Sequence, residues 1–152
     1  MKRLITFALV ALSVLYVNAQ TIHSPNKKLA LTFTLSPSGE PTYQLSLGQK
    51  KVVLPSVLGI EVKDQPSFIR GFTVAKVESS VVDESWNPVW GEVKTIRNHY
   101  HELKITLQQS EVKNRALGIT FRLFDDGVGF RYEFVRQDNL NYFTVTNEKT
   151  EF

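Results

Sequence analysis

The sequence contains no cysteine and a single methionine among its 152 residues. The absence of cysteine excludes disulfide bonds, thiol catalysis and metal sites built on thiolate ligands. It also excludes a lipoprotein whose lipid is attached to a cysteine at the signal cleavage site. Without disulfides, a chain of this size must be stabilised by an ordinary hydrophobic core.

Long hydrophobic runs are also rare, and the only one lies at the N-terminus. Residues 4–15 are mostly apolar and follow the basic pair Lys2 and Arg3, while small residues end the segment near Ala19. This pattern predicts an export signal peptide over residues 1–19, because the run is too short for a comfortable membrane span. We therefore expect a soluble exported protein of the bacterial periplasm, without a membrane anchor.

Neither sign of charge dominates the chain, which has 18 Lys and Arg against 15 Asp and Glu and a net charge of +3. Removal of Lys2 and Arg3 with the signal peptide lowers 18 to 16 and the net charge from +3 to +1. No basic block remains that would attract nucleic acid, so we expect no nucleic-acid partner.

Helical periodicity is missing, whereas alternation of apolar and polar residues recurs along residues 20–152. Turn sequences rich in glycine, proline and aspartate separate the alternating segments. The longest predicted strand runs from 92 to 108, with a break or bulge near Asn98–His99. The predicted strands are 28–35, 42–47, 51–54, 58–62, 72–82, 92–108, 117–123, 130–134 and 142–146. This pattern predicts an all-β fold, an antiparallel β-sandwich.

One stretch, residues 86–101, holds both tryptophans and two of the three histidines. Pro88 and Gly91 interrupt regular structure around Trp90, and charged residues of both signs follow. Aromatic rings beside directional hydrogen-bonding groups suit a hydroxyl-rich ligand. Tryptophans that anchor a core are an equally good interpretation. The candidate substrate-binding or partner-facing residues are Trp86, Trp90, Glu92, Arg97, Asn98 and Tyr100.

The remaining polar residues predict no catalytic residue and no metal site. Asp125-Asp126-Gly127 has the composition of a tight turn, and Glu133 is expected to pair with Arg131 on a solvent face. Glu92 is the carboxylate that best fits a pocket edge, with a structural hydrogen-bonded role as the alternative. His99 and His101 share one strand face, but no third metal ligand is visible nearby.

Three segments resemble the N-terminal domain of glycoside hydrolase family 97, and the likeness extends in order over the mature chain. They are Trp86-Asn87-Pro88-Val89-Trp90-Gly91-Glu92, Ile96-Arg97-Asn98-His99-Tyr100-His101-Glu102-Leu103 and Phe124-Asp125-Asp126-Gly127-Val128-Gly129-Phe130-Arg131-Tyr132-Glu133-Phe134. The family contains exported α-glucosidases and α-galactosidases. Residues 20–152 are thus identified as part of such a domain.

The resemblance implies a β-supersandwich of the galactose-mutarotase type, incomplete in this chain. In the family this domain packs on a catalytic (β/α)8 barrel, shapes the rim of its active site and meets α-linked oligosaccharides. The catalytic groups come from the barrel, and the ligands of the family's calcium are expected to lie outside this fragment. The fragment alone is therefore expected to be inactive. The alternatives are a free-standing carbohydrate-binding module and a structural or interaction domain.

Overall fold

The computed structural model describes residues 19–109, 111–112, 115–137 and 140–152, so the predicted signal peptide lies outside the described residues except for Ala19. The described part of the chain contains ten strands and no helix, so no helix there is long and apolar enough to cross a membrane. The strands are β1 (Gln20–His23), β2 (Leu29–Leu35), β3 (Pro41–Leu47), β4 (Lys50–Val57), β5 (Ile60–Val62), β6 (Phe72–Trp86), β7 (Ile96–Gln109), β8 (Ala116–Leu123), β9 (Val128–Glu133) and β10 (Val145–Glu148).

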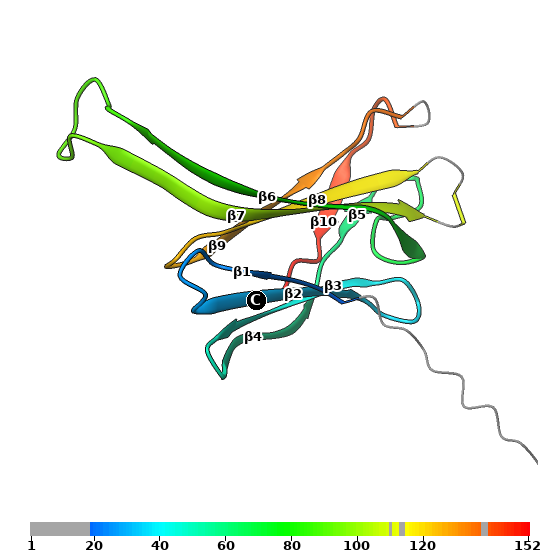
Figure 1. The fold of residues 1–152 in the computed structure, drawn as a ribbon. Coiled ribbons are helices and arrows are strands. Elements are labelled where there is room, and N and C mark those ends of the chain that lie inside the picture. Colours follow the sequence, from blue (N-terminus) through cyan, green and yellow to red (C-terminus); the bar gives the residue numbers. More distant parts are fainter. Residues whose placement is uncertain (1–18, 110, 113–114, 138–139) are drawn as a thin grey trace, which may run out of the picture.

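The strands form two four-stranded antiparallel sheets and a small two-stranded one. The first sheet has the order β1-β2-β3-β4 and the second β6-β7-β8-β9, while β10 pairs with β5. Figure 1 shows the two larger sheets as stacked layers, with β5 and β10 toward one end. The predicted all-β antiparallel sandwich is confirmed.

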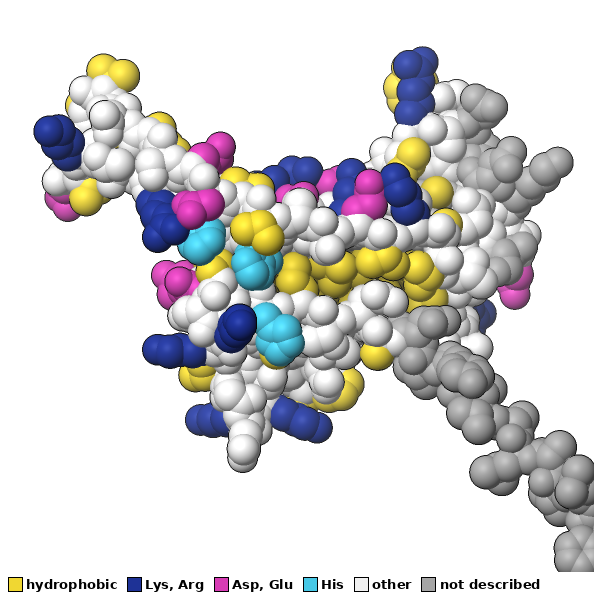
Figure 2. Space-filling view, in the orientation of Figure 1, with side chains coloured by type: hydrophobic (Ala, Val, Ile, Leu, Met, Phe, Trp, Pro, Cys, Tyr) yellow, Lys and Arg dark blue, Asp and Glu magenta, His cyan; other side chains and the backbone are white. Residues whose placement is uncertain are grey.

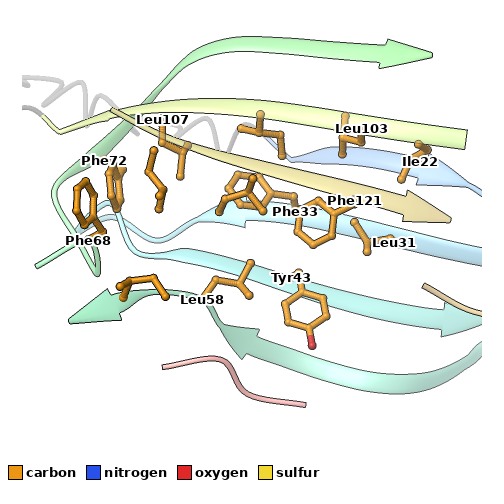
Figure 3. Packing of buried hydrophobic residues seen from close by; sticks show 14 of the residues in the cluster. Ile22, Leu31, Phe33, Tyr43, Leu58, Phe68, Phe72, Leu103, Leu107 and Phe121 are labelled. Atoms are coloured by element: carbon orange, nitrogen blue, oxygen red, sulfur yellow. The ribbon is translucent and has the colours of Figure 1, made fainter. Parts of the chain in front are cut away.

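The hydrophobic core lies between the two larger sheets, where alternating residues of β2, β3, β7 and β8 point inward (Figure 3). In β2 the pattern Leu29, Leu31, Phe33 is buried, as the alternation in the sequence predicts. The Phe121 ring of β8 lies 6.3 Å from that of Phe33 and 6.0 Å from that of Tyr43. These aromatic contacts join the two layers.

The predicted ends of several strands are wrong. The strand predicted to end at Val82 continues to Trp86, and its partner begins at Ile96 rather than at Glu92. The predicted break near Asn98–His99 is absent, because both residues pair regularly with β6. The register shift lies instead between Val74 and Lys76.

The two ends of the chain also differ from the prediction. β1 was not predicted, and it pairs with β2 over all four of its residues. The last strand covers Val145–Glu148 rather than 142–146, and it pairs with β5. Both strands are short, and each pairs with only one other strand. A segment of four residues is too short to show a clear alternation of apolar and polar residues.

Candidate functional site on a protruding arm

The tryptophan-rich stretch forms the end of a two-stranded arm. β6 and β7 pair from Phe72↔Gln109 to Trp86↔Ile96, whereas β8 accompanies β7 only as far as the pair His101↔Leu123. Residues 82–100 therefore extend beyond the sandwich as a hairpin, which we call the arm (Figure 1). A two-stranded hairpin is marginally stable by itself, so its own side chains must hold it together.

The tip of the arm, residues 86–95, exposes large apolar side chains to solvent. Val89 is 101% exposed and Trp90 88%, while Trp86 and Val93 are 49% and 60% exposed. Gly91 has φ +147°, a backbone conformation that side chains other than hydrogen rarely allow. Neither tryptophan belongs to the hydrophobic core, and such a cluster of exposed apolar groups is typical of an interaction surface.

Cross-strand polar contacts stabilise the arm along its length. The Arg97 guanidinium donates from Nε and Nη2 to the two carboxylate oxygens of Asp83, at 2.8 and 2.7 Å. The Asn98 amide donates to Glu84 Oε1 at 2.7 Å. Nearer the tip, the Thr95 hydroxyl donates to Asn87 Oδ1 at 2.8 Å.

The base of the arm is anchored by Tyr100, which is 5% exposed. Its ring lies 5.1 Å from that of Phe124, and the Arg122 guanidinium lies 4.7 Å above it. Arg122 also pairs with Glu102 at 2.8 Å, and this bond raises the pKa of Arg122. Tyr100 therefore fixes the direction of the arm instead of facing an open surface.

The structure distributes the six predicted site residues among three surroundings. Trp86, Asn98 and Tyr100 lie on one face of the arm, since Trp86↔Ile96 and Glu84↔Asn98 are paired positions. Arg97 lies on the opposite face of the arm, which it shares with His99 and Asp83. Trp90 and Glu92 are in the exposed tip, and the Glu92 carboxylate has no hydrogen-bond partner among the described residues.

Sequence reasoning missed the other two apolar residues of the tip, Val89 and Val93. Alternation cannot find them, because they belong to an irregular loop. The sequence does contain one indication of them. Apolar side chains occur between Pro88 and the start of the strand at Ile96, where a turn exposed to solvent would be polar.

The carboxylates and histidines do not gather into a metal-binding group among the residues that the structure describes. No set of three or more His, Asp or Glu there is placed to hold a metal ion. His99 and His101 have ring centroids 6.4 Å apart, and the His101 Nδ1 bonds the carbonyl of His23 at 2.8 Å.

Asp125 and Glu133 both serve structural roles. Asp125 lies in the turn closed by the Phe124 N–H to Gly127 carbonyl bond of 2.8 Å, and it accepts a bond from the Asn26 N–H at 2.7 Å. Glu133 pairs with Arg131 as expected, but also with Lys104 at 2.7 Å. These donors, with the Thr120 hydroxyl, lower the pKa of Glu133 from 4.5 to about 2.

A hollow of about 770 Å³ lies beside the base of the arm and not at its tip. It is bordered by β1, β6 and β7, and His23, Ser80 and His101 are among its lining residues. Figure 2 shows the three histidines gathered on this face, beside a band of hydrophobic side chains between the layers. None of the six predicted site residues lines it.

Comparison with known proteins places this geometry in a family. A family model described as "Glycosyl-hydrolase 97 N-terminal" matches residues 22–152. The chain belongs to this family. The match covers all ten strands except the first two residues of β1, and thus includes the arm.

Solved structures of the family agree with the fold. A glycoside hydrolase family 97 enzyme from Pseudoalteromonas sp. strain K8, solved with panose and with acarbose, is 32% identical, with a TM-score of 0.82 in both cases. The match covers 88% of this chain and 20% of that enzyme, so the chain spans a fifth of the relative's length. A β-arabinopyranosidase, 24% identical with a TM-score of 0.77, shares the fold over 86% of this chain and 20% of its own.

Proposed function

We propose that the chain is the N-terminal carbohydrate-associated part of an exported α-glycosidase, an α-glucosidase or α-galactosidase. The catalytic groups would come from a (β/α)8 barrel elsewhere in the parent polypeptide. The 152 residues alone would have no hydrolase activity, and calcium would be bound by residues outside them. Family membership supports this proposal, as does the length of the relative, of which the match covers only 20%.

The apolar tip of the arm is the observation that carries the assigned role. The hairpin exposes Val89, Trp90 and Val93 to water beyond the core. This exposure is unfavourable, and a surface that covered these side chains would lower the free energy of the protein. The bonds from Arg97 and Asn98 to β6 keep the arm extended, so the tip is presented at a fixed distance from the sandwich. We infer that the tip packs on the catalytic barrel and borders the active-site rim.

We propose an α-linked oligosaccharide as the ligand of the parent enzyme, because structures of relatives contain such ligands. The Pseudoalteromonas enzyme is described in complex with panose and with acarbose, both of which are oligosaccharide-like ligands. At the rim, the exposed Trp90 ring would supply a flat apolar surface, and Glu92 would supply a free hydrogen-bond acceptor.

The test uses the full-length parent polypeptide, which includes the proposed catalytic barrel. It compares the Trp90→Ala and Glu92→Ala variants with the unchanged protein. We expect Trp90→Ala to lower the unfolding temperature or kcat/KM, and Glu92→Ala to raise KM for α-linked oligosaccharides. Val52→Ala, an exposed apolar change on β4, serves as the matched control. Unchanged KM and stability in both arm variants would contradict the proposal.

A free-standing carbohydrate-binding module is the second candidate, favoured by the exposure of Trp90 at 88%. It predicts that maltose-series sugars or galactosides change the tryptophan fluorescence of the 152-residue chain, because both tryptophans lie at the tip. A flat titration would exclude this candidate and leave the interface role of the arm.

A further inference from the structure

Gly129 is a glycine in the interior of strand β9 that its surroundings in the described chain do not require. Its φ is not in the positive range that favours glycine, and β9 pairs with β8 without a register shift. A Cβ atom at this position would meet no heavy atom within 4 Å, whereas one at Gly118 would lie 3.0 Å from the Cβ of Glu133. A glycine inside a strand weakens it, and where no bulge, bend or crowding needs it, it marks the close approach of another molecule.

Gly129 interrupts a layer of polar side chains on the outer face of the second sheet. Phe121 of β8 is fully buried, so its neighbours in the strand point away from the core. Opposite residues of β7, β8 and β9 form two adjacent rows on this face, Glu102–Arg122–Gly129 and Lys104–Thr120–Arg131. The first row thus has no side chain on the β9 side of Arg122, while the second row is filled.

A hollow of about 300 Å³ opens beside Gly129. Its lining residues are Thr120, Arg122, Phe124, Gly129, Phe130 and Arg131, and none of these is acidic. Both guanidinium groups are accessible, because the Arg122 side chain is 41% exposed and that of Arg131 is 61% exposed. Small-molecule sites have volumes of ~300–1,000 Å³, so a hollow of this size admits a single ring.

Each of the two arginines uses only part of its guanidinium within the protein. Arg122 donates from Nε to Glu102 at 2.8 Å, and its Nη1 and Nη2 have no hydrogen-bond partner among the described residues. Arg131 holds Glu133 through Nε and Nη2, both at 2.9 Å, which leaves its Nη1 without a partner there. Nη1 and Nη2 form the end-on edge of a guanidinium, which matches the two oxygens of a carboxylate.

We propose that this hollow binds a hexuronate, a sugar ring that carries one carboxylate. The carboxylate accepts from Nη1 and Nη2 of Arg122, and a ring hydroxyl accepts from Nη1 of Arg131. The apolar face of the ring lies on the backbone at Gly129, beside the Phe124 ring. The choice of a sugar rests on the proposed carbohydrate-associated role, whereas the choice of a carboxylate follows from the two guanidinium groups.

The experiment titrates the ¹⁵N-labelled chain with D-glucuronate at neutral pH and constant ionic strength. It follows the backbone amide resonance of Gly129 and the Nε–H resonance of Arg122, and we expect saturable shifts of both. Glucose, which has no carboxylate, should bind at least about tenfold more weakly, because it loses the charge-assisted bonds to Arg122. Acetate should also bind more weakly, since it has no ring to cover Gly129.

Gly129→Ala tests the site without removing a charge. The added methyl group meets no protein atom, so the chain should fold, but it fills the floor of the hollow and should lower the affinity for glucuronate about tenfold. Gly127→Ala is the matched control, because its methyl group also meets no protein atom and Gly127 does not line the hollow. Its affinity should equal that of the parent chain.

Arg122→Lys keeps the positive charge and loses the end-on edge, so it should abolish the saturable shift at Gly129. The backbone resonances of residues distant from the hollow report whether this variant is folded. Because Arg122 also contacts Tyr100, the Gly129→Ala result decides the matter if Arg122→Lys does not fold.

Four results would overturn the proposal. They are resonances that do not move with glucuronate, an equal affinity for acetate, an equal shift with chloride, which would show an adventitious ion only, and an unchanged affinity in Gly129→Ala. The proposed function is tested separately, because the Trp90→Ala and Glu92→Ala variants change the tip of the arm and leave this hollow intact.

Discussion

Arg97 and Asp83 join the two strands of the arm through parallel hydrogen bonds of 2.8 and 2.7 Å. They occupy diagonal positions, because Arg97 is opposite Ser85 and Asp83 is opposite His99. The bond from Arg97 lowers the pKa of Asp83, and Asp83 raises that of Arg97. Both side chains are largely solvated, so the pair orients the arm more than it stabilises the sandwich.

Asp83→Asn should loosen the arm and leave the core unchanged. Amide hydrogen exchange of residues 82–100 should become faster, while the unfolding midpoint stays within error of the parent chain. Because the folded pKa of Asp83 is lowered, the contribution of the pair is present above its unfolded pKa of about 3.9 and is lost as pH falls through the folded pKa. Protection of the arm in the parent chain should therefore fall toward that of the variant in acid.

A matched control for the arm is Glu78→Gln, which removes the ion pair with Lys76 on the same strand but nearer the sandwich. This change should not alter exchange at the tip. Equal protection of the arm in Asp83→Asn and in the parent chain at neutral pH would contradict the assigned role of the pair.

Glu133→Gln should destabilise the chain in a pH-dependent way. The carboxylate accepts from Lys104, Arg131 and Thr120, and its pKa is lowered from 4.5 to about 2. Its contribution is complete above about pH 5 and is lost as pH falls from 4.5 to about 2. The difference in unfolding midpoint between parent and variant should be constant above pH 5 and should shrink steadily below it. A difference that does not change with pH would refute this account.

Phe121→Ala tests the packing between the two layers. The ring is fully buried and contacts Phe33, Tyr43 and Phe130 from both sheets. Its truncation should cost about 3–5 kcal/mol, which is a large part of the ~5–15 kcal/mol available to a domain of this size. Urea unfolding measures this change.

The contrasting variant is Trp90→Ala, which removes a larger but exposed ring. In the 152-residue chain it should alter stability by no more than about 0.5 kcal/mol. A larger loss would mean that Trp90 packs within the sandwich, contrary to the position of the tip.

The sequence predicted the sandwich because its strands have one buried face. Leu103, Ile105 and Leu107 alternate with polar residues, and the structure buries all three between the layers. The arm was predicted less well for the same reason. Residues 83–85 have solvent on both faces and need no alternation, so the sequence offered no sign that β6 continues to Trp86.

The position of the candidate site residues in the fold could be predicted only in part. Residues 86–101 indicated an aromatic loop, but whether Trp90 is buried depends on the length of β6 and β7 beyond β8, which is a tertiary property. The bond from Asn26 to Asp125 joins residues 99 positions apart, and no local pattern predicts it.

Quenching of Trp90 fluorescence tests the central claim, that the arm tip packs on a catalytic domain. The Trp86→Phe variant leaves Trp90 as the only tryptophan of this chain, and the tryptophans of the catalytic part are subtracted with a matched Trp86→Phe, Trp90→Phe variant. Acrylamide quenching is compared between the 152-residue chain and the polypeptide that contains the catalytic part. We expect Trp90 to be quenched freely in the shorter chain and protected several-fold in the longer one. Equal quenching in both would show that the tip remains in solvent, and would contradict the proposed role of the arm.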